Sequence, residues 1–190
     1  MGFIAEFIRG ERVSTLDNFL SARDGVMMSE RDDYQFLLDG IPTNKIGKRD
    51  LRRQISLVQQ DVFLFSGSIL DNIRLGNSYL EIDQIKSIAE SVNLHQFVEC
   101  LPDKYEQNVL ERGSVLSLGQ KQLLSFARAL ATDPRILVLD EATSSIDTET
   151  ELQVQSGIKE LIRGRTSIII AHRLSTLKNV DKILVLKEGH

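Results

Sequence analysis

The spacing of apolar residues predicts that strands and helices alternate along most of this chain. Residues 136–139 are all apolar, which indicates a strand buried on both faces, as in a parallel sheet. Residues 167–171 and 182–186 are further apolar strands, and residues 54–60 form another that ends in polar residues. Residues 35–40 indicate a short strand closed by an Asp-Gly turn.

Helical spacing appears between these strands. One helix is expected to begin at Asp83, which can cap it, and to end before Leu101 and Pro102. Its inward positions are Ile85, Ile88, Ala89 and Val92.

A second helix has a clearer start. Ser117 and Gln120 have the spacing of a capping box, in which each side chain can bond to the other residue's backbone N–H group. The helix should stop at Asp133-Pro134. Leu123, Ala127 and Leu130 share its apolar face.

A third helix is expected to be capped by Asp147, with acidic residues in its first turn that favour the helix dipole. Its buried positions are Val154, Ile158 and Leu161.

The alternation predicts an α/β domain in residues 35–190, with a mostly parallel sheet flanked by helices and a helical subdomain at about residues 72–133. Residues 1–34 do not follow the pattern and are treated as a separate, unmatched segment. Within it, Thr15 could start a helix that buries Leu16, Phe19 and Leu20.

Composition narrows the possible functions. The chain has 190 residues, 42% hydrophobic and 26% charged, as in ordinary globular domains. A net charge of −4 gives no sign of the basic face that nucleic-acid binding would require. Cys100 is the single cysteine, so no internal disulfide can form, and we expect it to be a small buried residue. No apolar run approaches the ~20 residues of a membrane helix.

Three polar residues are the first candidates for chemistry. Asp140 and Glu141 follow one buried strand, and His172 follows another, so all three should meet at the carboxyl edge of the sheet. Such a set suggests metal-assisted phosphoryl transfer, with Asp140 holding Mg²⁺ through water and Glu141 polarising an attacking water. Alone, the acids could equally be a solvated turn and the histidine a structural residue.

Longer motifs decide between these readings. The segments VLSLGQKQLLSFARAL, DPRILVLDEATSSID and GRTSIIIAHRLSTL resemble the nucleotide-binding domain of an ABC transporter ATPase. LSLGQ at residues 116–120 is similar to the family's LSGGQ signature, with Leu118 in place of a glycine. Residues 63–77, FLFSGSILDNIRLGN, and the ERG element at residues 111–113 resemble the exporter branch in particular.

The resemblance assigns roles to individual residues. ILVLDE resembles the Walker B strand, with Asp140 on Mg²⁺ and Glu141 as catalytic carboxylate. Asp147 ends the D-loop, His172 is the switch histidine, and Gln60 is the Q-loop glutamine, which contacts nucleotide and Mg²⁺ through water.

The resemblance also implies cofactors and partners. Two such domains would bind head to tail with ATP and Mg²⁺ between them, and Ser117, Gly119 and Gln120 of one would contact the γ-phosphate held by the other. A separate transmembrane domain would carry out transport, which places the chain in the cytoplasm at the inner face of the membrane. The related LSGGE motif of chromosome-maintenance and DNA-repair ATPases fits less well, because Gln120 replaces the glutamate and no coiled-coil heptads are present.

One family motif is missing from the sequence. The phosphate-binding loop G-x-x-x-x-G-K-[ST] should precede residues 35–40, and no segment matches it. Residues 40–49, GIPTNKIGKR, contain a Gly-Lys pair, but Pro42 and Arg49 break the pattern, so Lys45 and Lys48 are expected to be solvated. We therefore expect an incomplete P-loop NTPase domain, cut at both ends. The strand before the loop would also be missing, which predicts a marginally stable sheet, because residues 1–34 do not suggest a replacement.

Three functions stay open at this point. The chain is an ATP-hydrolysing subunit of an ABC exporter that cannot bind ATP well alone, or a non-catalytic partner that supplies the signature motif to a full-length subunit. The third possibility is the product of a broken gene, since the sequence changes abruptly near Tyr34. The transported substrate cannot be read from these residues.

Overall fold

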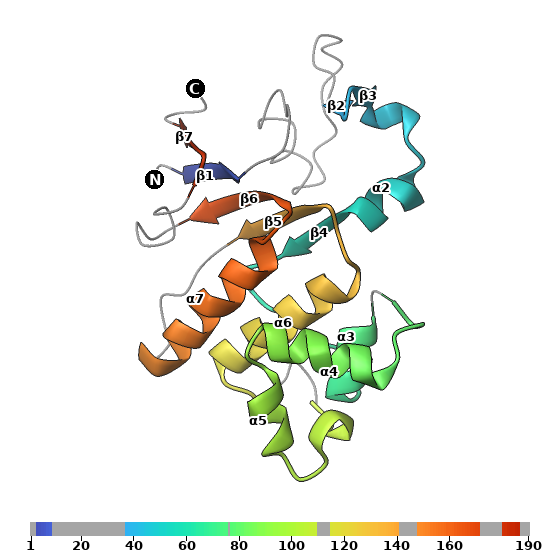
Figure 1. Cartoon of the computed structure of the whole chain (residues 1–190), viewed down its shortest axis with the longest axis vertical. Helices are drawn as coiled ribbons and strands as arrows, with labels where there is room; N and C mark the ends of the chain where they lie inside the picture. The colour runs from blue at the N-terminus through green and yellow to red at the C-terminus, as the bar shows by residue number, and fades with distance from the viewer. Residues whose placement is uncertain are drawn as a thin grey trace.

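A five-stranded sheet with the order β4-β5-β6-β1-β7 forms the upper part of the molecule (Figure 1). The computed structural model describes residues 3–8, 37–75, 77–109, 115–140, 148–171 and 180–186. The strands of the sheet are β1 (Phe3–Ile8), β4 (Ile55–Val58), β5 (Ile136–Asp140), β6 (Thr166–Ala171) and β7 (Lys182–Leu186).

The sheet is mostly parallel, as expected. β4 pairs in parallel with β5, and β5 pairs in parallel with β6. β1 is antiparallel to both β6 and β7, so β7 runs in the same direction as β6. All five residues of β5 are buried, which confirms the prediction from their unbroken apolar run.

The strand β1 corrects one expectation. Residues 1–34 were expected to leave the sheet with an open gap, but Phe3–Ile8 lies between β6 and β7 and bonds to both. The register pairs Ile4 with Ala171 on one side and with Val185 on the other. Because β1 satisfies the facing backbone groups of both neighbours, the sheet is continuous from β4 to β7. The helix predicted from Thr15 lies outside the described residues.

Two long helices, α6 (Leu118–Ala131) and α7 (Thr148–Ile162), lie side by side on one side of the sheet (Figure 1). Their predicted inward residues are buried, including Leu123, Ala127, Val154 and Leu161, while Leu130 is half-buried. Gly157 allows the two helices to approach closely, because a Cβ atom at this position would lie 3.2 Å from Cδ2 of Phe126.

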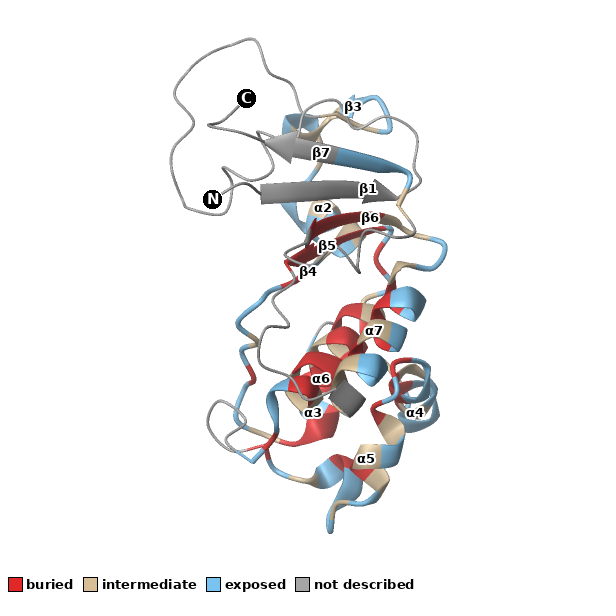
Figure 2. Ribbon diagram, turned by 90° about the vertical axis from the view of Figure 1, so that its left-hand side faces the viewer, coloured by how far each residue is buried: buried red, intermediate tan, exposed pale blue. Residues whose placement is uncertain are grey.

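Shorter helices pack beyond α6, at the end of the molecule away from the sheet (Figure 1). Figure 2 shows that their buried residues face α6. One apolar core therefore runs from Leu137 in the sheet through Leu123 to Ile85 in this group. Its elements are α3 (Ile69–Arg74), α4 (Ile82–Ser91), α5 (His95–Glu99) and η2 (Lys104–Glu106).

A small irregular region precedes the edge strand β4. It contains β2 (Leu37–Leu38), β3 (Ile41–Pro42), η1 (Thr43–Lys45) and α2 (Lys48–Gln54). The predicted Asp-Gly turn is confirmed, since Asp39 and Gly40 join β2 to β3 with φ values of 48° and 77°. Lys45 and Lys48 are exposed, as predicted. Gln54 ends α2, so the strand expected over residues 54–60 is shorter than predicted.

Three local predictions were wrong. The helix expected to end before Leu101 stops at Ser91, and the separate short helix α5 follows it. The helix α4 is capped by Glu81 rather than Asp83, because the Glu81 backbone N–H donates to Oε1 of Gln84 at 2.9 Å and completes a capping box two residues earlier. Cys100 is exposed rather than buried, since it follows the five-residue helix α5 at the surface. Among the described residues, no helix is long and apolar enough to cross a membrane.

Candidate functional site

The carboxyl edge of the parallel strands brings together two of the predicted site residues. Asp140 is the last residue of β5 and is only 7% exposed. In the neighbouring strand, Val58 is the last residue and lies opposite Leu139, so the exposed Gln60 follows at the same edge. Ligands of open α/β sheets bind beyond this edge.

The amino end of α6 carries three more predicted residues. Ser117 is the N-cap: its Oγ accepts a hydrogen bond from the Gln120 backbone N–H at 3.3 Å, and Oε1 of Gln120 accepts one from the Ser117 N–H at 2.9 Å. The predicted capping box is therefore confirmed. Gly119 is buried in the first turn. Backbone N–H groups and the positive end of the helix dipole make such an end suited to an anion.

A small cavity lies between α6, α7 and the carboxyl edge of the sheet, and Ser117, Gly119 and Gln120 are not among its lining residues. Gln122 on α6, Asp140 on β5 and Gln59 after β4 are its polar lining residues. Gln122 is 6% exposed, and sequence reasoning did not select it as a site residue. Helical spacing offered a signal, since Gln122 lies three residues after Gly119 and four before Phe126, on the buried face.

Three predicted residues cannot be placed. Glu141, Asp147 and His172 lie outside the described residues, so their expected roles stay predictions.

The donor atoms at the carboxyl edge fit Mg²⁺. This ion prefers oxygen ligands, and the carboxylate of Asp140 and the side-chain oxygen of Gln60 are of that kind. It usually needs only one or two protein carboxylates and keeps several waters. The described residues contain no group of three or more His, Cys, Asp or Glu side chains that could form a closed metal cage. Bound there, Mg²⁺ would neutralise developing charge on a phosphoryl group.

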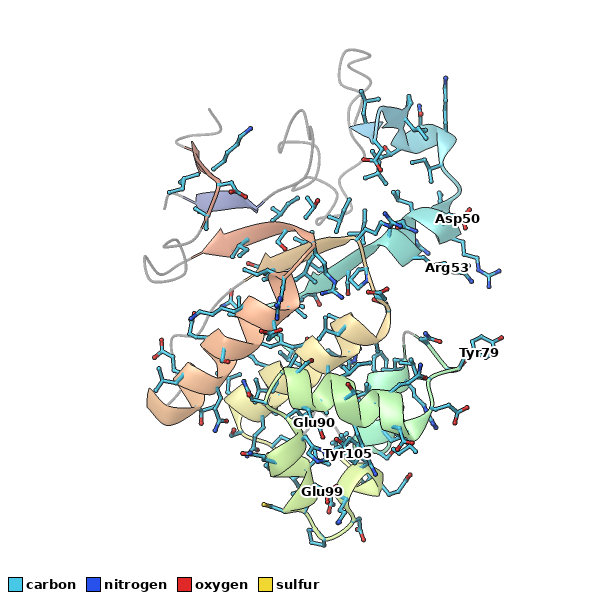
Figure 3. All side chains as sticks on the ribbon, in the orientation of Figure 1. Asp50, Arg53, Tyr79, Glu90, Glu99 and Tyr105 are labelled. Carbon is cyan, nitrogen blue, oxygen red and sulfur yellow. The ribbon has the colours of Figure 1, made fainter. Side chains whose placement is uncertain are left out.

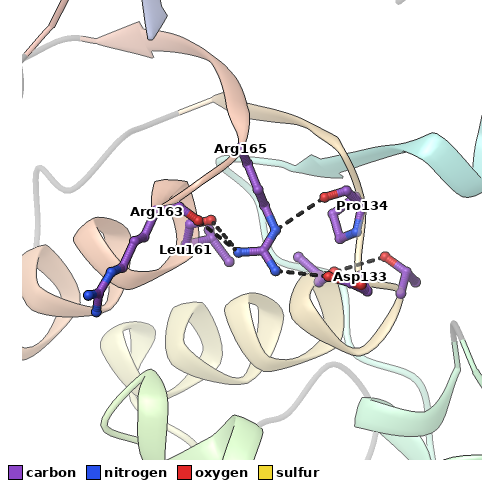
Figure 4. Close-up of polar contacts among 7 residues, drawn as sticks. Asp133, Pro134, Leu161, Arg163 and Arg165 are labelled. Carbon is purple, nitrogen blue, oxygen red and sulfur yellow. Dashed lines mark hydrogen bonds and ion pairs between the residues drawn. The ribbon is translucent and has the colours of Figure 1, made fainter. Parts of the chain in front are cut away.

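The opposite, amino edge is held by Arg165 (Figure 4). Its guanidinium donates to the carbonyl oxygens of Pro134 at 3.1 Å, Arg163 at 3.3 Å and Leu161 at 3.4 Å, and to Oδ1 of Asp133 at 3.1 Å. This side chain joins the turn before β6 to the turn before β5.

A groove opens beside β4 and α6, with a volume of about 590 Å³. Two of its lining residues, Phe63 and Phe65, are 54% and 48% exposed and pack edge to face with ring centroids 5.0 Å apart. Leu57 and Leu75 are also half-exposed. Such a concentration of exposed apolar side chains marks an interaction surface.

Polar bonds fix the shape of this groove. Arg128 of α6 donates to the carbonyl oxygens of Phe63 at 2.9 Å and Asn72 at 3.0 Å, and to Oδ1 of Asn72 at 2.7 Å. Asn72 in turn donates to the Phe65 carbonyl at 2.9 Å. The guanidinium also lies 5.6 Å from the centroid of the Phe65 ring, and its burial lowers the pKa of Arg128.

A separate polar cluster lies in the helical group. His95 Nδ1 and the Tyr105 hydroxyl oxygen are 2.7 Å apart and share a hydrogen bond. Burial of Tyr105, with the nearby carboxylates of Glu99 and Glu90, raises the pKa of Tyr105 to about 12 (Figure 3). We assign a structural role to this cluster, because it packs α5 against η2.

Comparison with known proteins agrees with this arrangement. The family model for the ABC transporter matches residues 14–144, more than half of the chain. The match begins inside the segment 1–34, and the domain boundary at residue 34 stays a prediction. Among curated relatives, the uncharacterized ABC transporter ATP-binding protein YknV of Bacillus subtilis is 50% identical over 152 residues, covering 80% of this chain and 25% of the relative.

Other relatives extend the similarity. The probable multidrug resistance ABC transporter ATP-binding/permease protein YheH of Bacillus subtilis is 45% identical over 186 residues, covering 95% of this chain and 28% of the relative. A fatty acid ABC transporter ATP-binding/permease protein of Mycobacterium bovis is 43% identical over 155 residues, covering 82% of this chain and 25% of the relative. The chain thus spans about a quarter of the length of the curated relatives it matches.

A solved structure shares the fold. A bacterial Atm1-family ABC exporter with ATP bound superposes with a TM-score of 0.70 at 37% identity, over 77% of this chain and 26% of that one. The P-loop NTPase fold expected from the motifs is therefore supported by both sequence and structure. The chain belongs to the ABC transporter ATP-binding family, and its homologues are of the exporter type.

Proposed function

We propose that this chain is the ATP-hydrolysing part of an ABC exporter, coupling ATP hydrolysis to transport through a transmembrane partner at the inner face of the membrane. The observation that carries the proposal is the buried Asp140 at the carboxyl end of β5, with Gln60 following β4 at the same edge, in a chain whose helix α6 begins at the capped Ser117. Asp140 would hold Mg²⁺ with Gln60. Glu141 and His172 would act on the attacking water and the γ-phosphate.

The two parts would serve different nucleotides. In a head-to-tail pair, Asp140 would act on ATP held by its own protomer, while Ser117, Gly119 and Gln120 would contact the ATP of the other. Asp147 would lie in the D-loop at the contact between the protomers. The orientation of α6 supports this role, because its first-turn N–H groups favour an anionic ligand.

We further propose that this chain alone binds ATP weakly. The sequence contains no G-x-x-x-x-G-K-[ST] loop. Hydrogen bonds to charged groups contribute roughly 1.5–3 kcal/mol each. Several are made by such a loop, so its loss removes a large part of the ~8 kcal/mol that corresponds to a micromolar Kd.

Calorimetric titration of the purified chain with Mg·ATP tests this proposal. We expect no measurable binding by the chain alone. A full-length nucleotide-binding domain with an intact loop but an inactive signature motif should bind Mg·ATP more tightly when this chain is added than when it is titrated by itself. The Ser117→Ala variant should weaken the second result. Micromolar binding of Mg·ATP by the chain alone would contradict the weak-binding proposal.

The second candidate function is a non-catalytic partner that supplies only the signature motif. The same mixture distinguishes it, because hydrolysis should then survive Asp140→Asn in this chain and be lost with Ser117→Ala. Loss of hydrolysis with Asp140→Asn alone would instead favour a catalytic subunit. No hydrolysis in any mixture would reject both functions.

The groove beside β4 is our proposed contact with the transmembrane partner. Exposed Phe63 and Phe65 offer aromatic anchors of the kind that dominate interfaces, and Arg128 keeps the loop that carries them in place. A short amphipathic helix from a cytoplasmic loop of the membrane domain would fit a groove of about 590 Å³.

Binding to the detergent-solubilised membrane half of a related exporter tests the groove. We expect Phe63→Ser to weaken binding at least tenfold, since a central aromatic anchor contributes about 2 kcal/mol or more. Tyr79→Ser is the matched control, because Tyr79 is 91% exposed and is not among the residues lining the groove (Figure 3). Equal weakening by both substitutions would reject the groove as the contact.

A further inference from the structure

The buried side chain of Gln122 has an unusual environment. It is 6% exposed, and within the described part of the chain its Oε1 atom is buried without a hydrogen-bond partner. Native proteins rarely leave such an atom unpaired, because the loss of hydration costs roughly 1–3 kcal/mol. Either the fold tolerates this cost, or the atom bonds to a molecule that the protein binds.

The cavity next to Gln122 supports the second explanation. It has about 20 Å³ of space that water can occupy, while one water needs roughly 10–15 Å³ and two to four polar partners. Gln122, Gln59 and Asp140 line it, so polar groups come from α6, from the end of β4 and from the end of β5. The remaining lining residues are apolar and limit the site to a single small molecule: Val58, Phe126, Leu139, Val154 and Ile158.

We infer that this cavity binds one long-lived water, which donates a hydrogen bond to Oε1 of Gln122 and bonds to polar groups at the ends of β4 and β5. Gln122 is thereby a positioning residue. Through the water it fixes the amino-terminal half of α6 against the strand that ends at Asp140.

The location gives this link a consequence for the reaction, which rests on the proposed function. In a head-to-tail pair, the first turn of α6 and Asp140 would serve two different nucleotides. Gln122 lies five residues after Ser117 on the same helix, so the water would join the two nucleotide sites within one protomer.

Substitution of Gln122 tests whether its Oε1 atom bonds to a water or has no hydrogen-bond partner. Gln122→Met keeps the length of the side chain and removes the acceptor. If the unchanged chain binds the water, this substitution removes the water's hydrogen bonds. The unfolding equilibrium constant of the full chain at fixed urea should then rise about fivefold or more. If Oε1 is unpaired, the same change should leave the constant unchanged or lower it.

Ser167→Ala is the matched control. Ser167 Oγ is the other buried side-chain atom without a partner among the described residues, and Ser167 is not among the residues lining the cavity. Its removal should change the unfolding constant by less than about twofold.

The unchanged full chain provides the spectroscopic test, which does not depend on the folding of any variant. NOE and ROE spectra should show a cross peak between the Gln122 side-chain amide protons and a water that stays bound longer than a nanosecond. Absence of the peak in the unchanged chain overturns the proposal, and so does a Met variant as stable as the unchanged chain. Neither measurement needs nucleotide, so failure of the proposed ATPase function would leave the result intact.

Discussion

The amino and carboxyl edges of the same three strands, β4, β5 and β6, are built in opposite ways. At the amino edge, Arg165 donates to three carbonyl oxygens, and the backbone N–H groups of Arg135 and Thr166 bond to Gln54 and Arg135 across neighbouring turns. At the carboxyl edge, Gln122 keeps a buried oxygen unpaired within the described residues, next to a cavity and Asp140.

This difference indicates that the amino edge stabilises the fold and that the carboxyl edge is available for binding. Paired polar groups such as those around Arg165 rigidify a region, although Ser167 Oγ near the start of β6 is also buried without a partner among the described residues. Unpaired polar groups, a helix amino end and a buried carboxylate cost stability but can bind an external molecule. α6 joins both edges, because Gln122 lies at one and the helix ends next to Asp133 at the other. The amino edge therefore provides the fixed support for the carboxyl edge.

The largest expected effect comes from breaking the amino edge. Arg165→Met should lower the free energy of unfolding by about 2–3 kcal/mol, because several bonds from one charged group are lost together. The ion pair itself contributes little, since the Asp133 side chain is 91% exposed. Urea unfolding measures the change. Arg163→Met is the control: its side chain is 79% exposed and, among the described residues, forms an ion pair with Glu160 at 3.5 Å, so a loss below about 0.5 kcal/mol is expected. Equal losses would show that the carbonyl bonds do not hold this edge.

The next-largest expected effect is a loss of stability at alkaline pH, which limits the pH range in which the two edges can be compared. The pKa of Tyr105 is raised in the folded chain, so its stabilising contribution is complete below the unfolded value of about 10 and is lost as pH rises towards about 12. Over this window the free energy of unfolding should fall by up to about 2 kcal/mol. Tyr105→Phe should remove this part of the pH dependence. An identical alkaline profile in both proteins would contradict the assignment.

At the carboxyl edge, loss of the cap should affect stability less than function. Ser117→Ala should cost about 1 kcal/mol, the usual value for an N-cap. Ser68→Ala provides a comparison, because Ser68 caps α3 with the same reciprocal bonds to Asp71 at 3.0 Å each. Both variants should lose similar stability in thermal unfolding, and only Ser117→Ala should impair nucleotide binding by the mixed pair. Impairment by both would assign the effect to stability alone.

The smallest effect is expected at Cys100. Cys100→Ser should change the free energy of unfolding by less than about 0.5 kcal/mol, because the residue is exposed. The resulting chain has no cysteine, so a label can then be attached through a new cysteine at either edge. A thiol reagent should react with the unchanged chain in its folded form, and failure to react would contradict the exposed position.

Much of the site could be predicted from sequence because local signals specify it. The capping box of Ser117 and Gln120 and the apolar run before Asp140 depend on neighbouring residues only, and both were found as expected. The predictions that were wrong concerned residues that compete for the same role or residues far apart in the sequence. Glu81 displaced Asp83 as a cap because both positions could satisfy the same helix end, and Gln84 decided between them.

The sequence by itself determined the family, the strands β5, β6 and β7, the long helices α6 and α7, and the residues at the ends of β5 and α6. Tertiary structure alone decided that Phe3–Ile8 completes the sheet, that Arg128 and Asn72 shape a groove, and that Gln122 faces a cavity beside Asp140. The physical reason is the distance along the sequence over which each interaction acts. Capping and periodicity act over three or four residues, whereas strand pairing and the hydration of a buried oxygen depend on groups that are brought together only when the chain folds.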